Sequence, residues 1–263
     1  MKRYLYLTGG FGNLLFQYTG WRHLSKITKK EILLRPILLN KNFLTTYVFR
    51  WHIHENYSKM LFSSNEMNNS KIGVIDLYLI FLLFLSKKFK RPLFGVMFQR
   101  TEENTLVENK IAYMGYYQNL NLYNSFFWDC VAELIKKMNI KSPVDRTVVH
   151  MRFGDSVWVL ENELYYEKIK FLLGKLDEKI YFVSDDYLRC EEFASSIGVE
   201  YEIYSSDMIS EFKFLTESRN CICAPSTFSW WASVMNLNEK NSIYMPLYFK
   251  ERFRLESSVI TYL

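Results

Sequence analysis

The sequence predicts an α/β protein whose second half carries a parallel sheet, and three observations support this class. From about Arg146 onward, short β-branched runs alternate with segments of helical period. A strand-like segment at the N-terminus runs into a glycine-rich turn, Gly9-Gly10-Phe11-Gly12, and then into a helical segment. Polar residues gather where the predicted strands of the second half end. Strands that alternate with helices in this way are joined by right-handed crossovers, as in a Rossmann-like fold.

The elements expected in the first half are less regular. Apolar periodicity predicts strands over Arg3–Leu7, Glu31–Leu34 and Ile111–Tyr116, and helices over Asn13–Leu24 and Leu120–Met138. Segment 36–110 is ambiguous and mostly helical by a weak pattern. Ser142-Pro143 is the best linker candidate, which predicts one domain over 1–143 and a second over 144–263.

The second half alternates regularly from its first strand to its last. The expected strands cover 147–151, Lys179–Val183, Glu200–Tyr204, Asn220–Cys223 and Ser242–Met245, and the expected helices cover Glu163–Leu176, Asp186–Ile197, Asp207–Arg219 and Thr227–Leu237. This half is therefore predicted to be one Rossmann-like domain.

Composition and charge narrow the classes of protein. Hydrophobic residues make up 49% and charged residues 23% of the 263 residues, which excludes a disordered, collagenous or coiled-coil chain. Aromatic residues reach 17%, a surplus suited to a large core and to a site that holds sugars or bases against rings. Residues 1–100 hold 16 basic and 4 acidic side chains, a local net charge of +12, whereas 101–263 carry −7. The two halves are thus expected to face different partners.

Cysteine usage and hydropathy indicate the cellular setting. Four cysteines without a C-x-x-C pair favour a reduced, cytoplasmic compartment, and the N-terminus has no pattern of a signal peptide. The longest apolar run, Val74–Leu85, falls short of the roughly 20 residues that span a bilayer. Basic residues at 87, 88, 90 and 91 follow it directly, which suits either a peripheral element at an anionic membrane or a buried helix followed by a solvated charge run.

Three polar clusters at strand ends are the strongest functional signal. They are His150-Met151-Arg152-Phe153-Gly154-Asp155, then Ser184-Asp185-Asp186, then the segment from Ala224 to Trp231. Ligands of open parallel sheets bind at the carboxyl ends of the strands. Arg152 at such an end suits bidentate phosphate binding. The alternative is that His150 is a core histidine and that Arg152 forms a local clamp with Asp155.

The other candidate residues each have a structural alternative. Ser226 and Thr227 begin a helix and could bind phosphate or simply cap it. Ser184, Asp185 and Asp186 could bond a base or a ribose, although Asp186 could equally cap the next helix. Gly10 and Gly12 would let the backbone approach a ligand, while Asn13 could bond a sugar or cap the helix. No metal site is expected: the adjacent acids form no D-x-D pattern, and His52-Ile53-His54 is interpreted as surface or core.

At these residues the chain resembles the α-1,2-fucosyltransferases of glycosyltransferase family 11. Four patches match in order. The first two are residues 9–18, which are similar to G-G-x-G-N-Q-x-F-Q-Y, and residues 114–119, which are similar to a G-Y-[FY]-Q segment. The others are residues 150–155, which match H-x-R-x-G-D, and the pair of segments 184–186 and 225–231. Two departures are Leu14 in place of Gln and Phe153 in place of a common second Arg.

The resemblance implies a short GT-B architecture of two Rossmann-like domains and transfer of fucose from GDP-β-L-fucose, with inversion, to a galactose-type hydroxyl. It implies that Arg152 grips the β-phosphate, that Ser226, Thr227 and Phe228 lie at the diphosphate, and that Asp185 approaches the guanine. Asn13 would face fucose and acceptor, Gly10, Gly12, His150, Ser184 and Asp186 would help form the binding site, and Asp155 is the nearest candidate for a general base. No cofactor or metal is expected.

Three other functions compete with this one. The chain could transfer another nucleotide-activated sugar, or it could be a non-catalytic glycan-binding or scaffold protein of the same fold. The basic, aromatic first half also suggests a nucleic-acid binder. The acidic second half and the absence of a basic-aromatic repeat argue against nucleic acid as a partner. The expected partners are therefore GDP-fucose, a galactose-containing oligosaccharide or lipid-linked glycan, and the surface of an anionic membrane.

Overall fold

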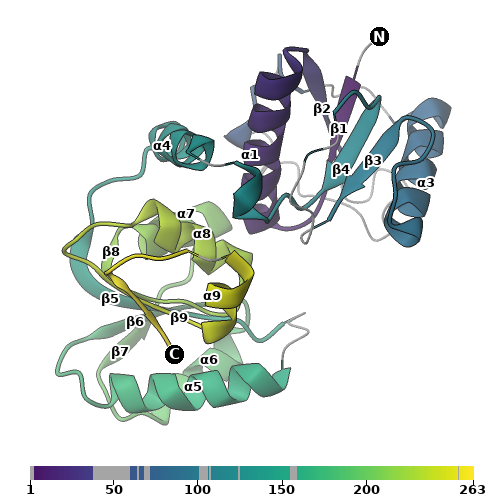
Figure 1. Cartoon of the computed structure of the whole chain (residues 1–263). Helices are drawn as coiled ribbons and strands as arrows, with labels where there is room; N and C mark the ends of the chain where they lie inside the picture. The colour runs from purple at the N-terminus through teal and green to yellow at the C-terminus, as the bar shows by residue number, and fades with distance from the viewer. Residues whose placement is uncertain are drawn as a thin grey trace. The chain divides into compact units, whose positions relative to one another are not determined.

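The computed structural model forms two compact units, Met1–Met138 and Asn139–Leu263 (Figure 1). It describes residues 3–37, 60–63, 65–67, 72–100, 106, 108–123, 125–154, 159–253 and 255–263, with side chains in the helix that follows residue 158 described from residue 164 onward. Both units are α/β, each with a parallel sheet, as the sequence predicts. The linker expected at Ser142-Pro143 stays a prediction.

The first unit is built on a four-stranded parallel sheet of order β2-β1-β4-β3. Its strands are β1 (Arg3–Leu7), β2 (Ile32–Pro36), β3 (Val96–Gln99) and β4 (Ala112–Gly115), and its helices are α1 (Phe11–Thr28), α3 (Val74–Phe89) and α4 (Phe126–Met138). In Figure 1, α1 and α3 lie on opposite sides of the sheet. Because each face is covered by a helix, the strands are apolar almost throughout, as buried parallel strands usually are.

A buried ionic group fixes α3 against this sheet. Asp76, in the first turn of the helix, accepts hydrogen bonds from the Tyr6 hydroxyl at 2.8 Å and from Arg35 Nε at 2.9 Å. Arg35 is 5% exposed, so this pair is largely withdrawn from water. The Arg35 and Tyr6 hydrogen bonds and the backbone N–H of Gly73 hold the pKa of Asp76 below its usual value, against the opposing effect of burial, which is the largest single influence. Removing one partner would leave a buried charge without compensation.

The second unit carries a six-stranded parallel sheet of order β10-β9-β8-β5-β6-β7. Its strands are β5 (Val144–Met151), β6 (Ile180–Ser184), β7 (Tyr201–Ile203), β8 (Ser218–Ile222), β9 (Ser242–Met245) and β10 (Ile260–Tyr262). Its helices are α5 (Val159–Leu173), α6 (Tyr187–Ser195), α7 (Met208–Thr216), α8 (Thr227–Met235) and α9 (Leu247–Phe253).

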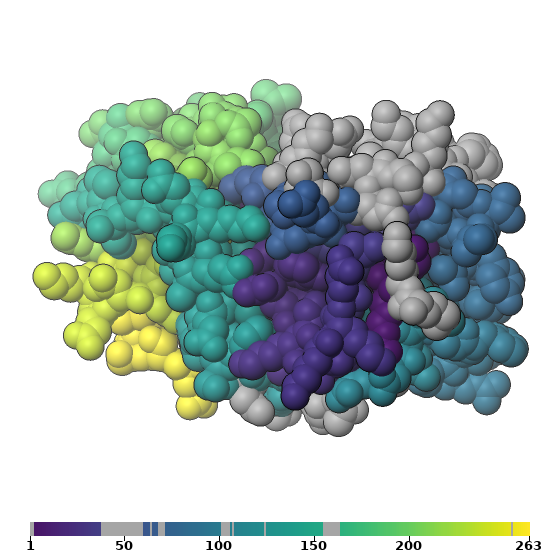
Figure 2. All heavy atoms as spheres, turned by 90° about the horizontal axis from the view of Figure 1, so that it is seen from above, coloured from purple at the N-terminus to yellow at the C-terminus, as the bar shows by residue number. Residues whose placement is uncertain are grey.

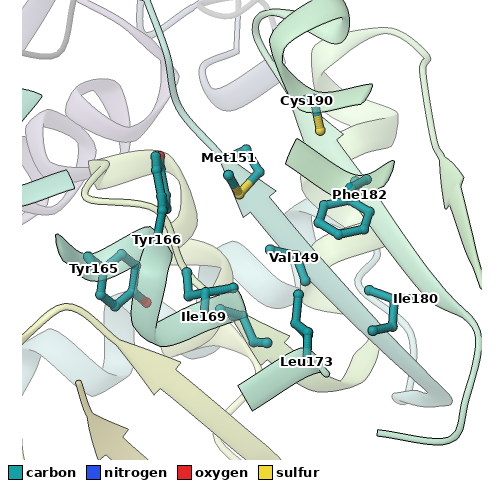
Figure 3. Close-up of a cluster of buried hydrophobic side chains, with 11 residues drawn as sticks. Val149, Met151, Tyr165, Tyr166, Ile169, Leu173, Ile180, Phe182 and Cys190 are labelled. Carbon is teal, nitrogen blue, oxygen red and sulfur yellow. The ribbon is translucent and has the colours of Figure 1, made fainter. Parts of the chain in front are cut away.

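Figure 3 shows the core that supports β5 and β6 on one face of the second sheet. Val149 and Met151 of β5 and Phe182 of β6 meet side chains of α5, with Tyr166 and Ile169 among them. All five side chains are buried. This packing fixes the carboxyl ends of β5 and β6, because a close-packed interior leaves its side chains little room to move.

The structure corrects the prediction for the first unit in two places. Segment 36–110 was expected to be mostly helical; its described part contains α3 but also the strand β3, whose four residues form the edge of the sheet. The helix expected from Leu120 begins only at Phe126, after a 3₁₀ turn over Leu120–Leu122. Asn119 causes this break because its side chain accepts the backbone N–H of Asn121 and so caps the short turn.

Candidate functional site

The three polar strand ends of the second unit lie side by side, as the sequence predicts. Strand β5 pairs in parallel with β6 on one side and with β8 on the other. Met151 is aligned with Ser184, and Val149 with Ile222, so the three strands end at the same edge of the sheet. The carboxyl edge of a parallel sheet is where open α/β folds bind ligands. We call this edge, with the segments 152–154, 184–186 and 224–228, the strand-end site.

Asp185 is the residue that ties the strand-end site together. Its carboxylate accepts the backbone N–H of Phe153 at 2.8 Å and that of Gly154 at 3.0 Å, and it pairs with Arg152 Nε at 3.2 Å. A Cβ atom at Gly154 would come within 2.5 Å of the Asp185 carboxylate, so the glycine permits this approach. One carboxylate that directly follows β6 therefore organises residues 152–154, which follow β5. The guanine contact expected for Asp185 stays a prediction.

Arg152 is held by its backbone and remains accessible at its side chain. The Tyr166 hydroxyl accepts the backbone N–H of Arg152 at 2.9 Å and donates to its carbonyl oxygen at 3.0 Å. The Arg152 side chain is 33% exposed. Since Asp185 contacts it through Nε, the guanidinium is oriented as well as charged, which suits a fork that binds an anion.

His150 occupies the buried centre of the strand-end site. The side chain is 4% exposed, and its ring lies 5.2 Å from the ring of Phe228. Burial, with a smaller effect from the charge of Arg152, lowers the pKa of His150 from 6.5 to about 3. The imidazole is therefore neutral at physiological pH. Its Nδ1 is buried and has no hydrogen-bond partner among the residues that the structure describes.

The start of α8 supplies the third side of the strand-end site. Ser226 is the N-cap of this helix, and its hydroxyl accepts the backbone N–H of Phe228 at 3.2 Å. Capping, which was the alternative for Ser226, is thus confirmed. Thr227 and Phe228 are half-buried in the first turn, and the Phe228 ring also packs against Phe212. The positive end of the helix dipole consequently points to the same edge as Arg152.

Ser184 and Asp186 stabilise the backbone at the end of β6. The Ser184 hydroxyl bonds both the N–H and the carbonyl oxygen of Asp186, each at 3.1 Å. Asp186 is the N-cap of α6 and accepts the backbone N–H of Arg189. The capping alternative for Asp186 is therefore confirmed. Arg189 in turn lies over the Phe153 ring at 4.8 Å, so a second guanidinium stands next to the segment that carries Arg152.

We expect His150 to make the protein less stable in acid. Below pH 6.5 the His150 imidazole is protonated in the unfolded chain, whereas in the folded protein it stays neutral down to about pH 3. The free energy of unfolding therefore falls as the pH drops through this window. Between pH 6.5 and pH 5 the loss is about 2 kcal/mol. Urea unfolding of the wild type and of His150→Phe at both pH values measures it. The variant should lose this part of the pH dependence, and equal pH dependence in the two proteins would contradict the assignment.

In the first unit, two sequence patches meet at the carboxyl edge of the sheet. Asn13, in the first turn of α1, accepts a hydrogen bond from Gln118 Nε2 at 2.9 Å, and Gln118 is buried. Gly9 has φ +92 and Gly10 is the N-cap of α1 with an extended backbone, so the turn uses its first glycine for a conformation that other residues avoid. Of the two alternatives for Asn13, helix capping is wrong, because Gly10 holds the N-cap position. The helix begins at Phe11, and Gly12 is buried within it.

Some sequence candidates lie outside the described residues. Asp155, the candidate general base, follows Gly154 directly but is not described, and the same holds for His52 and His54. Among the described residues no group of three His, Cys, Asp or Glu side chains is placed to hold a metal ion.

Two residues that contribute to these sites were not predicted from the sequence, Tyr166 and Gln118. A signal for Gln118 existed, since it belongs to the G-Y-Y-Q patch, whereas Tyr166 lies inside an ordinary helical pattern.

Comparisons with known proteins bear on the fold. No protein-family model and no curated protein sequence matches the chain. Among solved structures, the fucosyltransferase NodZ from Bradyrhizobium aligns with a TM-score of 0.50 at 11% identity, over 89% of this chain and 94% of that one. The E. coli heptosyltransferase WaaC aligns with a TM-score of 0.46 at 9% identity, over 100% of this chain and 93% of that one. The chain thus has an α/β fold with two parallel sheets, as in GT-B glycosyltransferases.

Proposed function

We propose that the protein is a glycosyltransferase that moves fucose from GDP-β-L-fucose to a galactose-type hydroxyl, with inversion and in α-1,2 linkage. The observation that carries this proposal is the strand-end site, where the oriented guanidinium of Arg152 and the N-terminus of α8 share one edge of a parallel sheet. Two such groups suit a diphosphate. The likeness in fold to a fucosyltransferase and the four sequence patches that resemble family 11 support the choice of sugar.

The chemistry explains why these groups would matter. Breaking the bond between fucose and GDP builds positive charge on the sugar ring and negative charge on the departing diphosphate. Groups that are fixed before the reaction stabilise this charge without reorganising. Arg152 would bind the β-phosphate, with Ser226, Thr227 and Phe228 at the diphosphate. Asp185 would act as a positioning residue, because it holds both the Arg152 side chain and the backbone that follows β5.

The first unit would supply the sugar and acceptor side. Asn13, oriented by Gln118, would present its amide to fucose and acceptor, while the backbone at Gly10 and Gly12 would lie near them. The acceptor hydroxyl needs a general base, and Asp155 is the proposed candidate. We further propose a galactose-containing or lipid-linked glycan of a surface polysaccharide as acceptor. The cytoplasm is the proposed compartment, because the four cysteines are free thiols.

A transfer assay with a panel of donors tests this proposal. Purified full-length protein is incubated with GDP-fucose, GDP-mannose, UDP-galactose and an ADP-heptose, each with a set of β-galactosides, and products are identified by mass and linkage analysis. We expect transfer from GDP-fucose alone. Transfer from another donor would replace the sugar but keep the enzyme class. Saturable binding of glycans without transfer from any donor would favour the non-catalytic alternative.

We expect the transfer to need no divalent metal. Metal-dependent glycosyltransferases generally hold the ion with paired carboxylates, whereas Asp185 here binds Arg152 and two backbone N–H groups and Asp186 caps α6. The diphosphate charge would instead be met by Arg152 and α8. Activity is measured after metal stripping and in excess EDTA. A loss of more than nine-tenths of the activity, restored by Mn²⁺ or Mg²⁺, would contradict this and reassign both acids as ligands.

A further inference from the structure

Large apolar side chains gather on the surface of the first unit along α3 and the segment after it. Val74 is 84%, Ile75 76% and Tyr78 58% exposed, and further along the same stretch Phe81, Phe84, Phe89 and Phe94 are exposed as well. These seven make up half of the exposed large hydrophobic side chains in the described part of the chain; the others are scattered over the rest of it. Single exposed apolar residues are normal, but a contiguous group marks an interaction surface.

Helix geometry places the exposed side chains on one face. Positions 74, 78 and 81 follow the i, i+4, i+7 spacing of a single helical stripe, whereas Ile80 and Leu83 are buried in the core beneath α3. The helix cannot roll to bury this stripe, because Asp76 is fixed to Arg35 and Tyr6. Figure 2 shows the residues around α3, drawn in blue, at the surface of the first unit. We call Val74, Ile75, Tyr78, Phe81 and Phe84, with the exposed basic residues next to them, the α3 face.

Basic residues border the α3 face at one end. Lys88 lies in the last turn of the helix, Lys90 ends it in a left-handed conformation, and Arg91 follows; all three are exposed. The surrounding sequence, residues 1–100, carries a net charge of +12. A face that is apolar and aromatic along its length and basic at its edge matches the interface of an anionic bilayer, where the rings enter the acyl boundary and the cations meet the headgroups.

We propose that the α3 face docks the protein on an anionic lipid surface, with α3 lying in the plane of the interface. A peripheral mode is the one available to α3, because no described helix is long and apolar enough to cross a membrane. The excess of positive charge disfavours a second copy of the chain as the occupant, since two such faces would repel each other. This inference is independent of the transfer reaction, because none of its residues belongs to the strand-end site.

Vesicle co-sedimentation of the full-length protein tests the proposal. The probes are vesicles of phosphatidylglycerol with phosphatidylethanolamine, and vesicles of phosphatidylcholine as the uncharged comparison. We expect binding to the anionic vesicles at about 0.05 M salt and a strong decrease at about 0.5 M salt, where charges are screened within a few ångströms. Tyr78→Ser/Phe81→Ser and Lys88→Gln/Arg91→Gln should each weaken binding roughly tenfold or more.

Matched variants separate this surface from a general effect of apolar or basic residues. Phe171→Ser/Leu188→Ser removes two exposed apolar side chains from the second unit, and Lys168→Gln/Lys240→Gln removes two exposed charges there. Both should bind vesicles as the wild type does. Equal binding to phosphatidylcholine, insensitivity to salt, or unchanged binding of both α3-face variants would overturn the proposal. So would a wild-type dimer in light scattering that Tyr78→Ser/Phe81→Ser converts to a monomer. The charge variant keeps the test valid if the apolar variant misfolds.

Discussion

Arg152→Ala is expected to lower turnover by about 10²–10³-fold while the protein stays folded, which is the scale of losing one preorganised group that stabilises developing charge. The side chain is one-third exposed and is oriented by the contact of its Nε with the Asp185 carboxylate, and it is not buried in the core, so its removal leaves the packing intact. The Tyr166 hydroxyl bonds the backbone at residue 152, and alanine preserves both of these hydrogen bonds. The measurement is steady-state transfer with GDP-fucose, with circular dichroism to show folding.

Two comparison variants sharpen this prediction. Arg152→Lys should also lose most activity, because a single ammonium cannot reproduce the planar fork of a guanidinium. Arg219→Ala removes another partly exposed arginine of the same sheet, one that pairs with Asp145 away from the strand-end site, and should retain activity. A folded Arg152→Ala protein with near wild-type transfer would remove the basis for placing the donor at this edge.

Gly115→Ala is expected to destabilise the first unit by about 2–5 kcal/mol, from backbone strain together with steric overlap. Gly115 has φ +154, and a Cβ atom there would lie 2.3 Å from the carbonyl oxygen of Gln99 in the neighbouring strand. The overlap cannot be relieved easily, because Gln99 and Gly115 are paired with each other at the end of β3 and β4. The loss is a large share of the stability of a typical domain. Thermal and urea unfolding of the full chain measure it.

The control for this substitution keeps the backbone strain and removes the overlap. Gly198 has φ +78, and a Cβ atom at this position would meet no other atom within 4 Å. Gly198→Ala should therefore lower the free energy of unfolding by about 1–2 kcal/mol at most. If Gly115→Ala unfolds no more readily than Gly198→Ala, the close approach of β3 and β4 is not as described. Because Gln118 follows three residues later, a destabilised Gly115 variant should also disturb its bond to Asn13.

Much of the second unit could be predicted from sequence because its signals agree. Strands β6 and β9 are short, mostly apolar runs. Helices α6, α7 and α8 each begin at a capping residue, namely Asp186, Asp207 and Ser226. The parallel order then follows from the alternation, and with it the convergence of the three polar strand ends. The sequence could locate the site for the same reason, since three polar clusters each follow a strand of one parallel sheet.

The parts that could not be predicted depend on contacts between distant residues. From sequence alone, Asp185 could equally bind a nucleotide base or serve as a structural carboxylate. Only the hydrogen bonds that it accepts from the backbone of Phe153 and Gly154 show that it organises a neighbouring segment. Strand β3 has four residues, too few for a periodicity to be distinguished from the helical pattern around it. The pairing of Asn13 with Gln118 joins positions 105 residues apart, beyond the reach of any local pattern.

Titration of GDP into the full-length protein tests the central claim most directly, because it isolates the diphosphate from the sugar and the acceptor. The strand-end site predicts saturable, calorimetrically measurable binding of GDP, weaker binding of GMP, which lacks the β-phosphate, and negligible affinity for oligonucleotides. It also predicts that Arg152→Ala weakens GDP binding by about tenfold or more, on the scale of a charge-assisted pair, while Arg219→Ala leaves it unchanged. Equal affinity of the wild type and Arg152→Ala for GDP, or equal affinity of the wild type for GDP and GMP, would contradict the account.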